Sequence, residues 1–153
     1  MPAITIVLAD DHEMFRSAVS DYLEKWPDFR VVSHASSGLE AVKQVQEQTP
    51  DILLLDIRLP DLDGLGVIQT LAANHSRTKV LALSAFNEQK YVTGVVDHGG
   101  FGYLLKVETP QVVLNVLRQV AAGEKYYFSQ EIEELLREWG YRLNNRLNEI
   151  QNT

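Results

Sequence analysis

Residues 51–56 read DILLLD, four consecutive apolar residues between two aspartates. A short apolar run without polar alternation is typical of a strand that is buried on both faces. The second aspartate, Asp56, follows this strand directly and is therefore held at a rigid position. A carboxylate placed there can act as a nucleophile toward phosphorus.

Four similar runs, rich in Val, Ile and Leu, accompany this strand at residues 4–9, 30–35, 80–83 and 101–105. A segment follows each run in which apolar residues recur with the helical period, as in Phe15, Val19 and Leu23. The alternation of strand and helix repeats five times. It predicts an α/β fold, a doubly wound parallel sheet with helices on both faces and right-handed crossovers.

Composition narrows the class of protein. The chain has 153 residues, the size of one domain, and no cysteine, which excludes disulfides and thiolate metal sites. Its net charge of -7 disfavours direct binding to DNA phosphates or anionic lipid. No apolar run approaches the roughly 20 residues of a membrane-spanning helix. We therefore expect a soluble, cytoplasmic protein without a membrane partner.

Polar side chains stand where four of the five predicted strands end: Asp10 with Asp11, Asp56, Ser84 and Lys106. In open parallel sheets, sites form outside the carboxyl ends of the strands. Three carboxylates that converge there require a cation, and hard oxygen ligands suit magnesium. A lysine ammonium and a serine hydroxyl can position and neutralise phosphoryl oxygens. The pattern indicates phosphoryl transfer.

Four motifs carry a family resemblance: Asp10-Asp11, DIRLP at residues 56–60 followed by Asp63-Gly64, Ser84-Ala85, and GYLLK at residues 102–106. Together they resemble the receiver domains of bacterial two-component response regulators, over about residues 4–122. The stretches ADDHEMFR, LSAF and GYLLK are similar to the NarL/FixJ (LuxR-type) group. The resemblance implies a flavodoxin-like (βα)5 fold with strand order 2-1-3-4-5.

The resemblance implies that Asp56 is the phosphoacceptor, that it takes a phosphoryl group from a sensor histidine kinase, and that Ser84 and Lys106 are the other catalytic residues. Such a protein phosphorylates and dephosphorylates itself as a switch, and we do not expect a turnover enzyme. Haloacid-dehalogenase-like phosphatases share the aspartate nucleophile, but they place a second acidic residue where this chain has Arg58. The remaining alternative is a receiver-shaped module that is never phosphorylated.

The resemblance also implies the metal site and the moving parts. Magnesium, for which manganese can substitute, would be bound by Asp11, Asp56 and the backbone carbonyl of Arg58, with Asp10 acting through a coordinated water. We expect solvated or capping roles for the four histidines; His12 borders the acidic pair without an assigned role.

Two further pairs of residues receive roles from the resemblance. Ser84 and Tyr103 would form the switch pair, in which the hydroxyl moves toward the phosphoryl group and the ring follows it inward. This motion would remodel the face around the fourth helix and fifth strand. Arg58 and Phe86, each two positions beyond a site residue, would lie over the phosphorylation site and set the lifetime of the phosphoryl group.

The sequence predicts a receiver at residues 1–124 and a linker or dimerisation helix at residues 125–153. Ser129 is the candidate N-cap, and the apolar stripe that follows contains Ile132, Leu136, Trp139, Leu143 and Ile150. Heptad spacing within the stripe favours a two-helix seam in a homodimer. The alternative is a helix folded back on its own receiver. Gly140 costs the helix roughly 1 kcal/mol in either case.

In the NarL/FixJ group such a linker leads to a helix-turn-helix output domain, for which this chain, ending at Thr153, has no room. Two alternatives remain open. In the first, a DNA-binding domain has been removed by truncation, and the receiver controls transcription and contacts DNA only through that absent domain. In the second, the chain is a stand-alone regulator that acts by protein contact.

Overall fold

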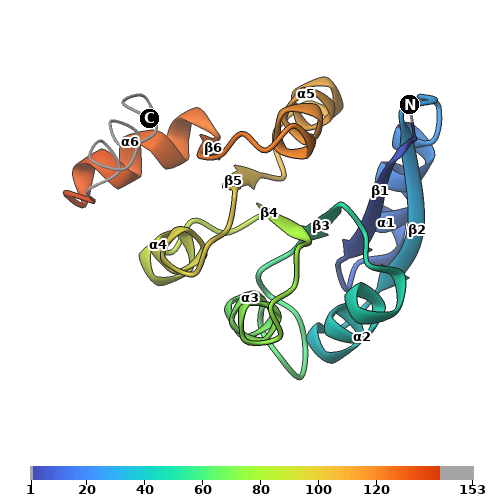
Figure 1. Cartoon of the computed structure of the whole chain (residues 1–153). Coiled ribbons are helices and arrows are strands. Elements are labelled where there is room, and N and C mark those ends of the chain that lie inside the picture. The colour runs from blue at the N-terminus through green and yellow to red at the C-terminus, as the bar shows by residue number, and fades with distance from the viewer. Residues whose placement is uncertain (1, 142–153) are drawn as a thin grey trace.

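The computed structural model describes residues 2–141, which form one parallel sheet with strand order β2-β1-β3-β4-β5-β6 (Figure 1). The strands are β1 (Ile4–Ala9), β2 (Phe29–Ala35), β3 (Ile52–Leu55), β4 (Lys79–Ser84), β5 (Gly102–Leu105) and β6 (Tyr127–Phe128). The helices are α1 (Glu13–Leu23), α2 (Gly38–Gln48), α3 (Gly64–Ala73), α4 (Gln89–Asp97), α5 (Pro110–Ala121) and α6 (Gln130–Glu138). The predicted flavodoxin-like order is confirmed, with a sixth strand added.

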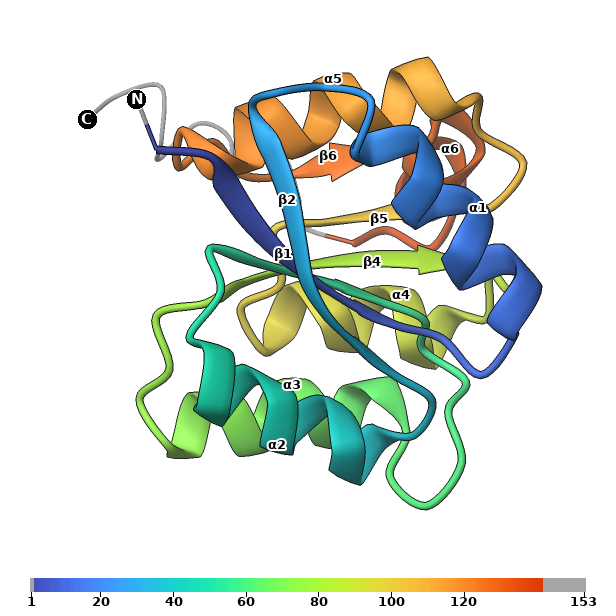
Figure 2. The ribbon, with the colours of Figure 1, turned by 90° about the vertical axis from the view of Figure 1, so that its right-hand side faces the viewer.

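Helices cover both faces of the sheet, with α1 and α5 on one face and α2, α3 and α4 on the other (Figure 2). β3 shows why its sequence is apolar throughout. Ile52 and Leu54 pack under α1 and α5, while Leu53 and Leu55 pack against α2, α3 and α4. Because successive side chains of a strand point to opposite faces, a strand covered on both sides has no position for a polar residue.

No helix among the described residues is both long enough and apolar enough to cross a bilayer.

β6 is a strand that the sequence did not predict. Tyr127 pairs with Gly102, and Phe128 pairs with Tyr103, both in parallel. A Cβ atom at Gly102 would lie 2.1 Å from the carbonyl oxygen of Tyr127, so only a glycine at this position lets the two backbones approach. The strand has two residues, which is too short for any hydrophobic period to be recognised.

α6 folds back onto its own receiver, which is the alternative to a dimer seam that the sequence left open. Ile132 and Leu136 are 0% and 1% exposed, and they share one core cluster with Tyr103 of β5 and with Val92 and Val95 of α4. Trp139 packs against the same cluster, partly buried. These three stripe residues therefore face the chain's own core and are not available to a second copy while α6 is docked.

The predicted stripe is not one continuous helix, because α6 ends at Glu138 and Gly140 adopts a left-handed backbone with φ +68°. The N–H of Tyr141 donates to the carbonyl of Leu136 at 2.9 Å, and that of Gly140 donates to Arg137 at 3.0 Å. These two bonds form a Schellman turn, which stops a helix. The remaining seam residues, Leu143 and Ile150, lie outside the described residues.

Ser129 occupies the predicted N-cap position of α6, but its side chain does not cap the helix. Its hydroxyl accepts a hydrogen bond from the buried N–H of Leu105 at 2.9 Å. The N–H of Ser129 donates to the carbonyl of Tyr103 at 3.2 Å. This residue therefore fastens the start of α6 to β5.

Leu136→Ala tests whether α6 belongs to the core in solution. Removing a fully buried leucine side chain leaves a cavity, and we expect the free energy of unfolding to fall by about 2 to 4 kcal/mol. Leu39→Ala is the matched control, since Leu39 is 60% exposed and should change stability by less than about 0.5 kcal/mol. Equal effects of the two variants in chemical denaturation would show that α6 does not dock.

Candidate functional site

The predicted site residues meet at the carboxyl edge of the sheet. Asp10 follows β1, Asp56 follows β3, Ser84 ends β4 and Lys106 follows β5. Asp10, Asp56 and Ser84 are 5%, 4% and 0% exposed, whereas Asp11 lies in an exposed position. Because all these strands are parallel and adjacent, residues far apart in the sequence are brought to one edge.

Backbone hydrogen bonds continue the sheet one residue beyond the strands and fix two of these positions. The N–H of Asp56 donates to the carbonyl of Ala9 at 2.9 Å, and the N–H of Lys106 donates to the carbonyl of Ser84 at 2.9 Å. The side chains of Asp56 and Lys106 therefore start from rigid backbone, as a preorganised site requires.

Lys106 bridges the two buried carboxylates. Its Nζ atom lies 2.6 Å from Oδ2 of Asp10 and 3.1 Å from Oδ2 of Asp56. The ring of Phe15 lies 4.5 Å from the same nitrogen and adds a cation–π contact. Burial acts to lower the pKa of Lys106, but the bond to Asp10 and the charge of Asp56 outweigh it, so the pKa is raised and the ammonium stays charged.

The environment of Asp56 disfavours the charged form of its carboxyl group. Burial raises the pKa of this carboxyl, the ammonium of Lys106 opposes the rise, and the charge of Asp10 adds to it. One ammonium faces two buried carboxylates, with the carboxylate of Asp11 beside them. The described site thus carries an excess of negative charge, which a bound cation would offset.

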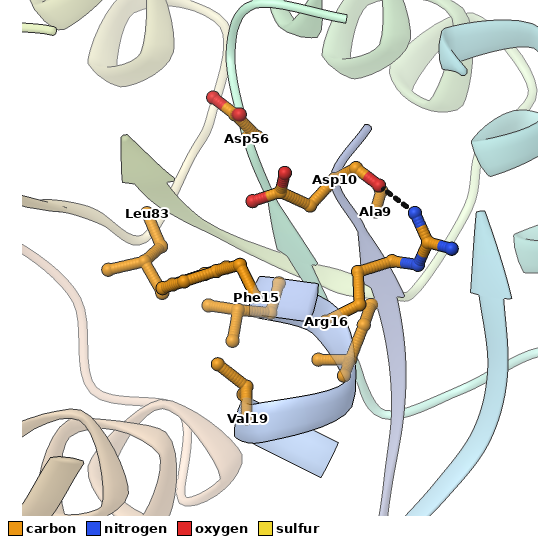
Figure 3. Close-up of a pocket in the computed structure, with 9 residues that line it drawn as sticks. Ala9, Asp10, Phe15, Arg16, Val19, Asp56 and Leu83 are labelled. Atoms are coloured by element: carbon orange, nitrogen blue, oxygen red, sulfur yellow. Dashed lines mark hydrogen bonds between the residues drawn. The ribbon is translucent and has the colours of Figure 1, made fainter. Parts of the chain in front are cut away.

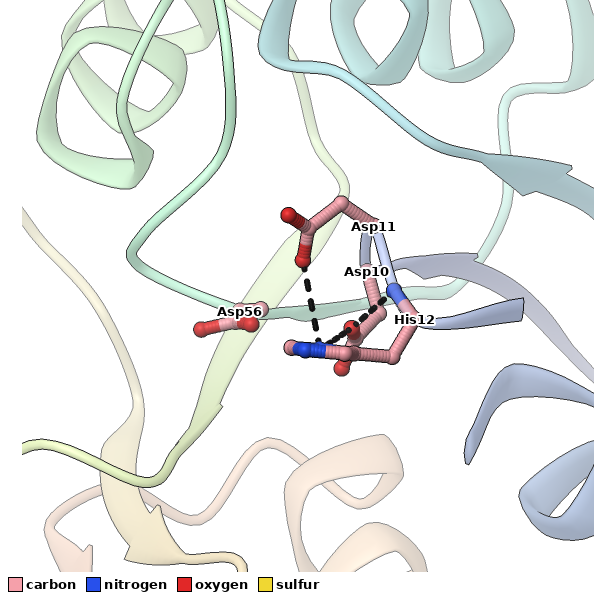
Figure 4. Close-up of side chains that lie close together, drawn as sticks. All are labelled: Asp10, Asp11, His12 and Asp56. Atoms are coloured by element: carbon pink, nitrogen blue, oxygen red, sulfur yellow. Dashed lines mark hydrogen bonds and ion pairs between the residues drawn. The ribbon is translucent and has the colours of Figure 1, made fainter. Parts of the chain in front are cut away.

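The donor set fits a hard divalent cation. Carboxylate oxygens of Asp10, Asp11 and Asp56 and a ring nitrogen of His12 lie within 4.8 Å of one another (Figure 4). The N–H of Arg58 donates to Oδ1 of Asp56 at 3.2 Å, so the backbone expected to supply a ligand carbonyl runs beside the same carboxylate. Oxygen donors and an exposed side that admits water suit magnesium.

Ser84 and Tyr103 meet on the backbone of Phe86. The N–H of Phe86 donates to the hydroxyl of Ser84 at 3.2 Å, and the hydroxyl of Tyr103 donates to the carbonyl of Phe86 at 2.6 Å. Tyr103 is fully buried, and burial raises its pKa to about 12. The ring expected to move inward already lies inside the fold.

Arg58 and Phe86, the two residues expected to lie over the phosphorylation site, are in contact with each other. The guanidinium of Arg58 lies 4.0 Å from the ring centre of Phe86 and 5.7 Å from that of Tyr91, and it forms an ion pair with Glu88, the N-cap residue of α4. Glu88 could not be predicted as a partner of Arg58, because it lies 30 residues away in the sequence and no local pattern connects the two. This pair ties the loop after β3 to the start of α4.

The first turns of α1 supply neighbours that sequence reasoning missed. Arg16 donates from its guanidinium to the backbone carbonyl of Asp10, and Phe15 and Val19 line a narrow pocket beneath Asp10 and Asp56 (Figure 3). The available signal was position, since α1 begins directly after the acidic pair. These contacts fix the loop that carries the acidic residues.

Comparisons with known proteins agree on one family. A family model described as the response regulator receiver domain matches residues 6–118. The transcriptional regulatory protein DegU of Brevibacillus brevis is 35% identical over 136 residues, which cover 89% of this chain and 58% of that protein. The nitrate/nitrite response regulator protein NarL of Escherichia coli (strain K12) is 35% identical over 120 residues, with 78% and 56% covered. The chain thus spans a little over half the length of these relatives.

Solved structures show the same similarity. The signal receiver domain of the putative response regulator NarL from Mycobacterium tuberculosis aligns with a TM-score of 0.78 and 31% identity, covering 81% of this chain and 100% of that one. A two-component response regulator of the LuxR family from Aurantimonas sp. SI85-9A1 aligns with a TM-score of 0.82, covering 89% and 96%. At 24% identity, the second likeness concerns the fold alone.

Asp56→Asn tests the burial of this carboxyl through stability. Because its pKa is raised in the folded state, the folded chain holds more protons than the unfolded chain between the two pKa values, so stability falls as pH rises through that range. We expect the variant to unfold at higher denaturant than wild type near pH 7. The difference should shrink as pH falls through the raised folded pKa toward the unfolded value of 3.8, and it should be absent below that value. A less stable variant near pH 7 contradicts this account.

Proposed function

The chain belongs to the response regulator receiver domain family, and on this premise we propose that Asp56 accepts a phosphoryl group from a sensor histidine kinase. The observation that carries the proposal is a buried carboxylate at a rigid strand end, 3.1 Å from an ammonium that also holds a second carboxylate. Phosphoryl transfer needs mainly positioning and charge neutralisation, and this arrangement offers both.

The transfer step divides among the residues of the site. An oxygen of Asp56 attacks phosphorus, the bond from phosphorus to the donor nitrogen breaks, and its electron pair leaves with the donor imidazole. Lys106 shifts toward the phosphoryl oxygens as its ion pair with the carboxylate of Asp56 is lost. The hydroxyl of Ser84 accepts from the N–H of Phe86, and in the transfer it would turn its own hydrogen toward a phosphoryl oxygen.

The donor set also supports magnesium at this site, with manganese as a substitute. Asp11, Asp56 and the backbone carbonyl of Arg58 would hold the ion, and Asp10 would act through a coordinated water. When bound, the ion supplies positive charge against the phosphoryl oxygens. The product is an aspartyl phosphate that water later hydrolyses, so the chain acts as a switch and not as a turnover enzyme. Arg58 and Phe86 set how long the phosphoryl group lasts.

The acceptor is tested by incubation with acetyl phosphate and magnesium, followed by intact mass measurement. We expect one added phosphoryl group on wild type, none on Asp56→Asn, and none when magnesium is chelated. Asp21→Asn is the matched control, since Asp21 is an exposed aspartate of α1 outside the site. Lys106→Met should slow the reaction by about 100-fold or more, because it removes a charge-stabilising group. A phosphoryl group on Asp56→Asn would refute the assignment.

Output from the site runs through β5. Tyr103 lies on this strand, Lys106 follows it, and Ser129 fastens α6 to it through Leu105 and Tyr103. A shift of Ser84 and Tyr103 toward a phosphoryl group therefore disturbs the surface of α4 and β5 on which α6 rests. The proposed consequence is that phosphorylation loosens α6. A homodimer seam through Ile132 and Leu136 becomes possible only after that step.

Hydrogen exchange measures the loosening of α6 directly. In excess acetyl phosphate and magnesium, amides of residues 130–138 should exchange about tenfold faster, equal to about 1.4 kcal/mol of opening free energy. The amides of β1 should not change, and Asp56→Asn should show no difference with the phosphodonor. Light scattering on the same samples reports whether a dimer forms. Unchanged exchange in phosphorylated wild type rules out this output route.

The wider role follows the relatives. DegU is described as a transcriptional regulatory protein and NarL as a nitrate/nitrite response regulator, and both are longer than this chain. By analogy, the receiver controls transcription in the cytoplasm, with DNA contacted only through an output domain outside these 153 residues. The alternative is a stand-alone regulator, for which the face of α4, β5 and α6 would contact another protein.

A further inference from the structure

We propose that Glu88 is a positioning residue for the proposed reaction. Its carboxylate holds the side chain of Arg58 across the solvent side of the acceptor and thereby slows the hydrolysis of an aspartyl phosphate at Asp56. The inference rests on the proposed function, because it takes Asp56 to be the phosphoacceptor. It adds a residue of α4 to those that set the lifetime of the phosphoryl group. Glu88 acts through Arg58 and is not itself a catalytic residue.

The side chain of Arg58 connects the two loops that carry Asp56 and Ser84. Its backbone lies in the loop after β3, where its N–H donates to Oδ1 of Asp56 at 3.2 Å. Its guanidinium reaches the loop after β4, where it lies 4.0 Å from the ring centre of Phe86. The N–H of Phe86 donates in turn to the hydroxyl of Ser84 at 3.2 Å. Arg58 therefore bridges the ends of β3 and β4, beside which a phosphoryl group on Asp56 would lie.

The carboxylate of Glu88 decides where this bridge rests. The rings of Phe86 and Tyr91, with centres 4.0 and 5.7 Å from the guanidinium carbon, offer a surface that attracts a cation. Glu88 places the opposite charge beside the same guanidinium. Because the side chain of Arg58 is 44% exposed, packing alone does not fix it, and the ion pair holds it in place.

The start of α4 directs the side chain of Glu88 toward Arg58. Glu88 is the N-cap residue of this helix, with extended dihedrals of φ -61° and ψ 135°, yet its side chain makes no capping bond. A glutamate near a helix N-terminus also stabilises the helix through the macrodipole, and that effect does not require Arg58. The two roles are distinguishable, because only the positioning role depends on the guanidinium.

Hydrolysis explains why the position of Arg58 matters. The oxygen of a water molecule forms a bond to phosphorus, the bond from phosphorus to the oxygen of Asp56 breaks, and its electron pair returns to the carboxylate. The water gives up a proton to the solvent, and inorganic phosphate leaves. Arg58 is half exposed whereas Asp56 is buried, so the bridge lies between the acceptor and the solvent. Without the charge of Glu88, the bridge opens more often and admits water more often.

The lifetime of the phosphoryl group tests this role. Each protein is phosphorylated with acetyl phosphate and magnesium, the phosphodonor is removed by desalting, and intact mass follows the loss of the phosphoryl group. We expect Glu88→Gln to lose it about two- to fivefold faster than wild type, the range that an exposed ion pair supports. Glu47→Gln is the matched control, since it removes the same charge from an exposed position in the last turn of α2 and should match wild type. Added salt should narrow the gap between wild type and Glu88→Gln, because it screens the pair.

A double-mutant cycle with Arg58→Met separates positioning from helix stability. In the Arg58→Met background, Glu88→Gln should change the lifetime no further, because the guanidinium on which it acts is gone. An equal shortening in both backgrounds would place the effect in α4 alone and overturn the inference. A lifetime of Glu88→Gln equal to or longer than that of wild type would overturn it as well. In both cases the proposed function stands, since the phosphoryl group was accepted; if wild type accepts none, the function and the inference fail together.

Discussion

The ion pairs of Lys106 with Asp10 and Asp56 are the constraint on which the rest of the structure depends. Two carboxylates, each no more than 5% exposed, stand at adjacent strand ends, and burying an unpaired charge costs several kcal/mol. A single ammonium satisfies both with one charge, so the cluster remains anionic and open to a cation. The same requirement fixes β5, because Lys106 reaches the carboxylates only when this strand pairs with β4.

Most of the fold and the centre of the site could be predicted because both follow from short-range rules. An uninterrupted apolar run predicts a strand covered on two faces, and parallel strands bring their ends to one edge, which places Asp56 near Ser84 and Lys106. Side-chain direction does not follow from such rules. The inward ring of Tyr103 and the pair of Arg58 with Glu88 depend on packing between segments that are distant in the sequence.

The C-terminal segment shows where periodicity stops being informative. An apolar stripe establishes that one side of a helix is covered, but a dimer partner and the chain's own core produce the same stripe. For Ile132 and Leu136 the cover is the chain's own core. Gly140 could have been recognised as a helix stop, because glycine readily adopts the left-handed turn that ends a helix. From the sequence it was considered only for its cost to helix stability. Ser129 was placed correctly at the start of α6, while its bond to β5 was not foreseeable.

The short sixth strand also has a consequence for the solubility of the fold. An exposed edge strand offers a row of unpaired backbone groups that can recruit strands from other chains and begin aggregation. β6 covers the outer side of β5 and replaces it as the edge with a strand of only two residues, immediately followed by α6. Such a short edge is a poor template for another strand. Any change that detaches β6, including a larger residue at Gly102, would expose β5 to self-association.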